Sequence, residues 1–219
     1  MSKIHYALPV LKHRKSSRVS KKKIVLLSAS SLRTIPRILC APLPTLYVSR
    51  LRIPSAYSIK KLKGKIDGLS ISLCGDLRYG RTVHSLGMAL SYYDVNIKLA
   101  APPTLRMKPA IIDEMKKAGV RVTEVDTVEE AVQDVDVVYM TRIQKERFPD
   151  VREFDDVKGK FRITSDEIGL MKDDAIVLHP LPRVDELASE IDSTPHAKYF
   201  DQVYSGVVTR MAILKLIFG

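Results

Sequence analysis

The chain has 219 residues and a formal net charge of +11 at pH 7. The basic charge lies at one end, because residues 1–66 hold sixteen Lys and Arg without an Asp or Glu, whereas the remainder holds twenty Lys and Arg against twenty-five Asp and Glu. The remainder therefore has a net charge of −5, which argues against nucleic-acid binding by the globular part. The chain has no apolar run near ~20 residues, so we expect a soluble, intracellular protein rather than a membrane protein.

The first 56 residues form a basic, acid-free segment without a clear helical or strand period. We expect residues 1–55 to be poorly ordered or loosely packed, since their cations lack acidic partners. An organelle transit peptide has this Ser- and Arg-rich composition, although the Lys cluster fits it less well. A basic arm that holds RNA is a second interpretation, although the apolar runs IVLL and LYV are unlike a solvated tail. The abrupt change in composition favours a third, a truncated or frameshifted gene.

A regular pattern begins at Tyr57, which makes 57–219 the predicted globular domain. The expected strands are 69–75, 95–102, 120–125, 135–140 and 175–180, and the expected helices are 57–65, 81–93, 108–119, 128–133 and 206–219. Nearly continuous apolar strands separated by helices indicate a buried parallel sheet with helices on both faces. The predicted fold class is therefore α/β, with functional sites at the carboxyl ends of the strands.

Cationic motifs follow three of these strands: GDLRYGRT (75–82), TRIQKERF (141–148) and LPRVDE (181–186). At one edge of a sheet they would form a cationic mouth, which consists of Arg78, Arg81, Arg142, Lys145, Arg147 and Arg183. Guanidinium groups bind carboxylate or phosphate in bidentate fashion, so an anionic ligand is expected there.

The first of these motifs has nearly the spacing of a nucleotide-binding loop, but its residues argue against that function. A phosphate-binding loop of this kind has Lys where the chain has Arg81. The strand that would end in an Asp for Mg²⁺ is followed instead by Thr141 and Arg142. A dinucleotide-binding fold would need G-x-G-x-x-G, and the loop reads GDLRYG.

The two cysteines predict neither a metal site nor a disulfide framework, because Cys40 and Cys74 lack the spacing of either. Cys74 lies inside a predicted strand, and we expect it to be a small buried hydrophobic residue.

Five long motifs occur in order: GDLRYGRTVHSL, YMTRIQKERF, HPLPRVDE, TPHAKYFDQ and GVVTRMAILKLI. Together they resemble the second half of aspartate carbamoyltransferase over 57–219, and HPLP in place of HCLP distinguishes the chain from the ornithine branch. The resemblance implies transfer of a carbamoyl group from carbamoyl phosphate to L-aspartate, which gives N-carbamoyl-L-aspartate and phosphate in pyrimidine synthesis. It implies no metal or organic cofactor, a homotrimer, and a cytoplasmic location unless the N-terminus is a transit peptide. A regulatory subunit stays open as a partner.

The resemblance also assigns substrate-binding residues. It implies that Arg81 and Arg142 clamp the two carboxylates of aspartate and that Gln144 helps to position the same substrate. The backbone carbonyls of Leu181 and Pro182 are implied to hold the carbamoyl and amino groups at a bend with a cis Leu–Pro bond, which about 5–6% of X–Pro bonds adopt.

No catalytic side chain is predicted, because the implied chemistry relies on proximity and charge stabilisation. His84 and His179 are expected to have structural roles. Residues 145–158 resemble the mobile loop that closes over aspartate.

The carbamoyl phosphate half of the family's site has no clear counterpart. The family's S-T-R-T loop has only a faint echo in SLRT (31–34), and no H-P-T-Q motif precedes residue 57. The activity of the chain alone is therefore in question, and two alternatives stay open: a non-catalytic aspartate-binding module and a basic-arm RNA-binding protein. The apolar helix at 206–219 packs on the missing domain in the family, so we expect it to leave an apolar face exposed and to cause self-association.

Overall fold

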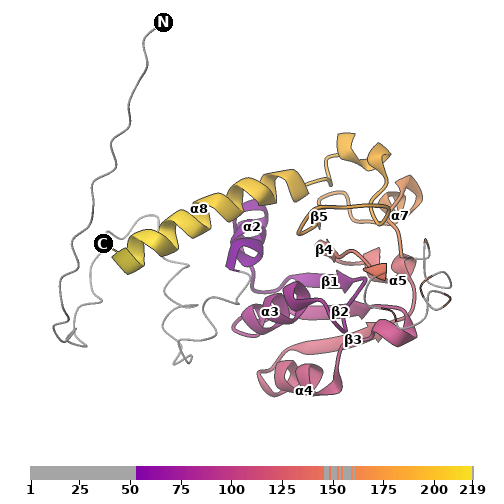
Figure 1. Ribbon diagram of the computed structural model, residues 1–219, viewed down its shortest axis with the longest axis horizontal. Coiled ribbons are helices and arrows are strands. Elements are labelled where there is room, and N and C mark those ends of the chain that lie inside the picture. Colours follow the sequence, from indigo (N-terminus) through magenta and orange to yellow (C-terminus); the bar gives the residue numbers. More distant parts are fainter. Residues whose placement is uncertain are drawn as a thin grey trace, which may run out of the picture.

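A five-stranded parallel sheet forms the centre of the computed structural model, which describes residues 53–145, 148, 152, 154, 159 and 161–218 (Figure 1). The strands are β1 (Ser70–Cys74), β2 (Asn96–Ala100), β3 (Arg121–Val125), β4 (Val137–Met140) and β5 (Ile176–Leu178). All strand pairs are parallel, and the order across the sheet is β3-β2-β1-β4-β5. The predicted α/β class with a parallel sheet is confirmed.

The strand order places β1 in the middle of the sheet. Its last residue, Cys74, is paired with Ala100 of β2 on one side and with Met140 of β4 on the other. The chain winds outward from β1 to β3 and then returns to β4 and β5 on the opposite side of β1. In open parallel sheets, ligands typically bind beyond the carboxyl ends of the two strands that flank such a reversal, here β1 and β4.

Helices cover both faces of the sheet, as predicted. The first face packs against α2 (Ile53–Lys63), α3 (Arg81–Leu90) and α4 (Pro109–Lys117), and the second face against α5 (Val128–Val132), α7 (Ser165–Gly169) and the 3-10 helix η3 (Ser189–Ser193). Each face of the sheet has its own hydrophobic core, and alternate residues of β1 point into one or the other. Ile71 and Leu73 belong to the core on the first face, and Cys74 belongs to the core on the second. Burial on both faces explains why β4 and β5 are continuously apolar, whereas β3 at the edge of the sheet carries exposed polar residues.

The last helix, α8 (Tyr199–Phe218), leaves the sheet and runs across α2 (Figure 1). At their contact Gln202 Nε2 donates to Ser55 Oγ over 3.1 Å. Ser55 is fully buried, so the expectation of loose packing up to residue 55 is wrong at this position. Residues 1–52, to which most of that expectation refers, lie outside the described residues.

Several elements differ from the sequence-based expectations. Helix α2 begins four residues before the expected domain boundary at Tyr57, and α8 begins seven residues before the expected helix start at residue 206. The short elements η1 (Pro103–Leu105), α7 and η3 were not expected. Within the described residues, no helix has both the length and the hydrophobicity that a membrane span requires.

Candidate functional site

The loops that follow β1 and β4 are in backbone contact at the reversal point of the sheet. Gly75 has φ +102°, and a Cβ at this position would lie 2.2 Å from the carbonyl oxygen of Thr141. Thr141 in turn donates to Cys74 O from its Oγ1 and from its N–H, each over 2.9 Å. Glycine is therefore required here for both its conformation and its size, and Arg142 follows this contact directly.

The rest of the β1 loop folds tightly and leads to Arg81. The buried carboxylate of Asp76 accepts the N–H of Tyr79 over 2.8 Å, and a Cβ on Gly80 would lie 2.2 Å from Asp76 O. His84 Nε2 lies 2.7 Å from Leu77 O, which fits the structural role expected for this histidine. The loop ends where α3 begins, so the exposed Arg81 occupies the first helical residue.

Arg142 and Gln144 follow β4 and are both half-buried. Because β1 and β4 are paired up to Cys74 and Met140, the sheet brings the segments that carry Arg81, Arg142 and Gln144 to the same part of its carboxyl edge. The N-terminus of α3 adds backbone N–H groups there, which favour an anion.

The bend after β5 contains a cis peptide bond between Leu181 and Pro182, which confirms the predicted isomer. Leu181 has φ +44°, which is uncommon for a residue other than glycine. Its N–H donates to His179 Nδ1 over 2.9 Å, and the N–H of His179 donates to Gln202 Oε1 of α8 over 2.9 Å. The bend at 181–182 is thus held, through His179, by hydrogen bonds to the first turn of α8.

Arg183 was expected to belong to the cationic mouth, but in the structure it is paired with an acidic residue. Its guanidinium binds the carboxylate of Asp192 in η3 with both terminal nitrogens and donates to Tyr199 Oη over 3.2 Å. The pairing with Asp192 raises the pKa of Arg183, and the same hydrogen bonds hold the pKa of Asp192 below its usual value of 3.8. Arg183 therefore fixes the bend to η3 and α8, and the prediction that it adds free positive charge to the mouth is wrong.

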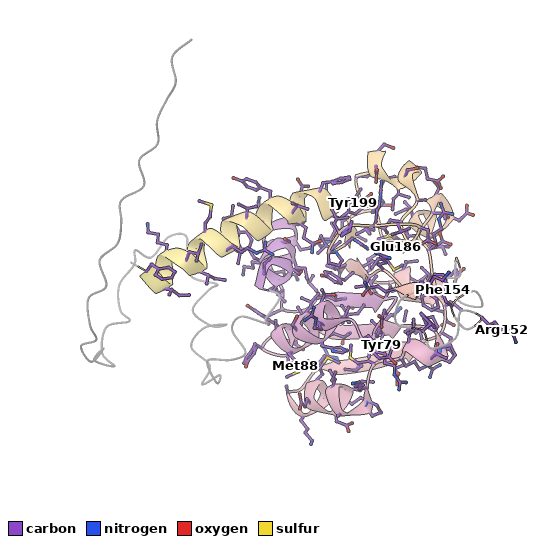
Figure 2. All side chains as sticks on the ribbon, in the orientation of Figure 1. Tyr79, Met88, Arg152, Phe154, Glu186 and Tyr199 are labelled. Carbon is purple, nitrogen blue, oxygen red and sulfur yellow. The ribbon has the colours of Figure 1, made fainter. Side chains whose placement is uncertain are left out.

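The segment expected to close over the site lies largely outside the described residues, as does Arg147. Its described side chains include Phe148 and Phe154, whose rings pack edge to face with centroids 5.6 Å apart. Lys145 Nζ lies 6.0 Å from the centre of the Phe154 ring. Figure 2 shows Phe154 and Arg152 at the end of the molecule toward which the strands point.

Cys74 is fully buried in β1, as expected, and burial raises the pKa of its thiol to about 12. A protonated thiol in the sheet interior is a poor nucleophile and a poor metal ligand. In the described part of the chain, no group of three or more His, Cys, Asp or Glu side chains is arranged to hold a metal ion.

A separate hollow of about 680 Å³ opens beyond β2 and β3, and the described residues that line it include none of the predicted site residues. Among the described residues, its lining includes the carboxylates of Asp126, Glu129 and Glu167 and one cation, Arg162. An acidic lining repels a dianion such as aspartate, so the carboxyl ends of β1 and β4 are the better candidate site.

The groups that hold these loops in place were not predicted from the sequence. Asp76, Glu186, Asp192 and Gln202 each bind backbone N–H groups or a side chain of a site segment. Asp192 and Gln202 lie 9 and 23 positions from the residues that they bind, so no local pattern marks them. Asp76 gives a local signal, because an Asp whose carboxylate binds the N–H three residues later is typical of a loop that starts a turn.

Comparisons with known proteins agree with this geometry. Residues 67–217 match the family described as aspartate/ornithine carbamoyltransferase, Asp/Orn binding domain. The aspartate carbamoyltransferase catalytic subunit of Thermococcus kodakarensis is 53% identical over 163 residues, which cover 74% of this chain and 53% of that protein. The catalytic subunit from Methanosarcina acetivorans is 48% identical over the same shares of the two chains.

Solved structures give the same result. The catalytic subunit of M. jannaschii aspartate transcarbamoylase superposes with a TM-score of 0.69 at 44% identity and covers 74% of this chain and 53% of that one. Aspartate transcarbamoylase from Trypanosoma cruzi in complex with carbamoyl phosphate and aspartate superposes with a TM-score of 0.67 at 34% identity, over 74% of this chain and 52% of that one.

The chain spans about half the length of the curated relatives that it matches. The match to the family covers most of the part of the chain that the structure describes and contains all of the predicted site residues. By sequence and by fold, this chain belongs to the aspartate/ornithine carbamoyltransferase family and contains its Asp/Orn binding domain.

Proposed function

We propose that this domain binds L-aspartate and supplies the aspartate half of a carbamoyltransferase site. Combined with a carbamoyl phosphate-binding half, it transfers the carbamoyl group to the aspartate amine, which yields N-carbamoyl-L-aspartate and phosphate. A cytoplasmic location, a homotrimeric assembly and a regulatory partner belong to the same proposal, through the resemblance to the family.

The observation that carries the proposal is the position of Arg81 and Arg142 on the two loops that meet at the reversal point of the sheet. Both carboxyl groups of L-aspartate are ionised at neutral pH, and each carboxylate matches the fork of one guanidinium. Gln144 adds an uncharged donor and acceptor beside Arg142. Structures of the T. cruzi relative in complex with aspartate and phosphate, and with N-(phosphonacetyl)-L-aspartic acid, support a ligand of this class.

The bend at Leu181 and Pro182 supplies acceptors of a different kind. Backbone carbonyls accept hydrogen bonds from an amine and from a carbamoyl NH₂ group, and they do so without a titrating side chain. In the proposed reaction the uncharged aspartate amine attacks the carbamoyl carbon, the C–O bond to phosphate breaks, and phosphate leaves with that electron pair and takes up the proton that the amine gives up. The domain contributes by holding the amine in place, which can account for a large part of the rate enhancement.

The test measures N-carbamoyl-L-aspartate formed from carbamoyl phosphate and L-aspartate. The 219-residue chain is assayed alone and after mixing with the half of the M. jannaschii catalytic subunit that this chain does not match. We expect product only from the mixture. A mixture that binds L-aspartate but forms no product would contradict transfer and favour the non-catalytic binding module.

Substitutions in the mixture test the clamp. Arg142→Ala should raise the KM for aspartate by about 10- to 100-fold, because a charge-assisted hydrogen bond is worth about 1.5–3 kcal/mol. Arg142→Lys should give an intermediate value, since it keeps the charge and loses the fork. The control is Arg121→Ala on β3, whose side chain forms an exposed ion pair with Asp94, and it should leave the KM unchanged.

The clamp also makes a geometric prediction. The guanidinium groups of Arg81 and Arg142 should lie within about 15 Å of each other, since wider separation exceeds the reach of one small dicarboxylate. A crystal structure of the chain with N-(phosphonacetyl)-L-aspartic acid would measure this distance, and a larger separation in the complex would exclude a shared ligand.

A further inference from the structure

The bend after β5 is flanked by two buried ionisable side chains, His179 before it and Glu186 after it. Their exposed fractions are 1% and 3%, and His179 Nε2 lies 2.8 Å from Glu186 Oε1. The contact does not have the geometry of a good hydrogen bond, so it is an electrostatic contact between two groups enclosed by protein. Burying such a pair costs free energy unless the remaining polar atoms are satisfied.

The remaining atoms of both side chains bind the backbone of the bend itself. His179 Nδ1 accepts the N–H of Leu181 over 2.9 Å. Glu186 Oε2 accepts the N–H groups of Val184 and Asp185, each over 3.2 Å. The residues between these anchors, 181–184, include the cis peptide bond. One end of the bend is thus held by the imidazole and the other by the carboxylate.

This arrangement requires one particular tautomer of the imidazole. Because Nδ1 accepts a hydrogen bond from a backbone N–H, it carries no proton. The ring proton must then be on Nε2, which faces the Glu186 carboxylate. The negative carboxylate stabilises a proton on Nε2. In general, the partner of one ring nitrogen determines whether the proton lies on that nitrogen or on the other.

We propose that His179 and Glu186 are positioning residues that act as one unit, the His179–Glu186 staple, in which Glu186 fixes the His179 tautomer that holds the Leu181 backbone. The staple orients the carbonyl groups that would bind substrate without touching the substrate itself. The role of the staple in catalysis rests on the proposed function. Its role in holding the bend does not depend on that function.

The first test is a spectroscopic measurement on the unmodified 219-residue chain without substrate. Long-range ¹H–¹⁵N correlation spectra identify which ring nitrogen of His179 carries the proton at neutral pH. We expect the Nε2–H tautomer, together with slow hydrogen exchange at the Leu181 amide. An Nδ1–H tautomer would overturn the proposal, and this result does not depend on whether any variant folds.

A matched pair of substitutions separates the two contacts of the imidazole. In His179→Asn the amide oxygen can take the place of Nδ1, and in His179→Gln the amide nitrogen can take the place of Nε2. Exchange of the Leu181 amide should therefore be about tenfold faster in His179→Gln and close to that of the unmodified chain in His179→Asn. The Val177 amide, which donates to His196 O in the adjoining strand region, is an internal control and should not change.

Glu186→Gln tests the coupling across the imidazole. The new amide oxygen can still accept from Val184 and Asp185, but its NH₂ group now faces Nε2 and requires Nε2 to act as an acceptor. The proton should move to Nδ1, and the Leu181 amide should exchange about tenfold faster although residue 186 does not contact it. Retention of the Nε2–H tautomer with unchanged Leu181 exchange would show that Glu186 does not set the tautomer.

These measurements separate failure of the staple from failure of the proposed function. If the tautomer and exchange results hold while neither the chain nor the mixture with the M. jannaschii half binds aspartate, the staple stands and the substrate assignment fails. If aspartate binds while the Leu181 amide is equally exchangeable in both His179 variants, the staple is excluded and the aspartate site stands.

Discussion

At the scale of single residues, the site is formed by close backbone contacts as much as by its cations. Gly75 lets the β1 loop approach the β4 loop to a distance that a side chain would prevent, because its Cβ would lie 2.2 Å from Thr141 O. Arg142 is the next residue in the β4 loop, so its position depends on this contact.

Gly75→Ala should therefore destabilise the domain by about 2–5 kcal/mol, as the sum of left-handed backbone strain and overpacking against a carbonyl. Gly119 is a matched control, since it has a similar φ of +94° and, apart from its chain neighbours, no described residue has an atom within 4 Å of the place that its Cβ would take. Gly119→Ala should cost about 1–2 kcal/mol from backbone strain alone. Urea unfolding of both variants measures the difference, and equal losses would mean that the two loops relax apart without penalty.

The ion pair between Arg183 and Asp192 predicts a pH-dependent contribution to stability. The pKa of Asp192 is lower in the folded chain than its usual 3.8, so the pair stabilises above that pH and its contribution is lost as the pH falls through the folded pKa. Both side chains are partly exposed, so Asp192→Asn should cost only about 1 kcal/mol or less at pH 7.

Urea unfolding of the unmodified chain and Asp192→Asn between pH 7 and pH 3 measures this contribution. The difference in unfolding free energy should shrink below pH 3.8, the usual Asp value. Asp94→Asn, in an ion pair whose side chains are 66% and 70% exposed, should show little difference at any pH. A difference for Asp192→Asn that stays constant down to pH 3 would contradict the role of its charge.

At the scale of elements, the strands could be predicted from the sequence and the ends of the helices less well. Strands such as β4 are buried on both faces, which gives a short apolar run that is visible without any structure. The first turns of α8 carry buried Tyr199 and Gln202 among exposed residues, so no apolar run marks its start. Helix α7 has a capping box formed by Thr164 and Glu167, a local signal that could have identified it.

The candidate site shows the same division. Arg142 lies two residues after the apolar strand β4, and Arg81 ends the loop that follows β1, so both could be identified in the sequence. The cis bond was expected from the resemblance to the family. The partners of the bend could not be predicted, because His179 binds Gln202 and Arg183 binds Asp192 through contacts that exist only after α8 and η3 have packed.

Helix α8 has an apolar face that the described residues leave uncovered. Its exposed hydrophobic residues are Phe200, Val203, Tyr204, Val207, Met211, Leu214, Ile217 and Phe218. This agrees with the expectation of an exposed apolar surface on the last helix, and a surface of this kind is a typical site of association.

We expect the isolated chain to self-associate through this face. Leu214→Ser combined with Phe218→Ser should lower the association, because each side chain is more than half exposed and gains little from folding. Leu170→Ser, an exposed apolar residue at the end of α7, is the control and should have no effect. Sedimentation velocity over a range of concentrations measures the outcome, and a monodisperse monomer of the unmodified chain would contradict the expectation.

At the scale of the whole molecule, the chain contains one complete α/β unit but about half the length of its curated relatives. Hydrogen bonds join the β4 loop to the end of β1 at the reversal point, and a second set joins the bend after β5 to the first turn of α8. The proposed transfer requires a second half, which would supply the carbamoyl phosphate.

The central claim is that the loops that follow β1 and β4 hold the two carboxylates of aspartate. The most direct measurement is an NMR titration of the ¹⁵N-labelled chain with L-aspartate, with L-alanine as a control that lacks the second carboxylate. We expect saturable shifts at residues 75–82 and 141–144 with L-aspartate, much smaller shifts with L-alanine, and loss of the response in Arg142→Ala. Equal responses to the two amino acids, or shifts confined to other parts of the domain, would contradict the claim.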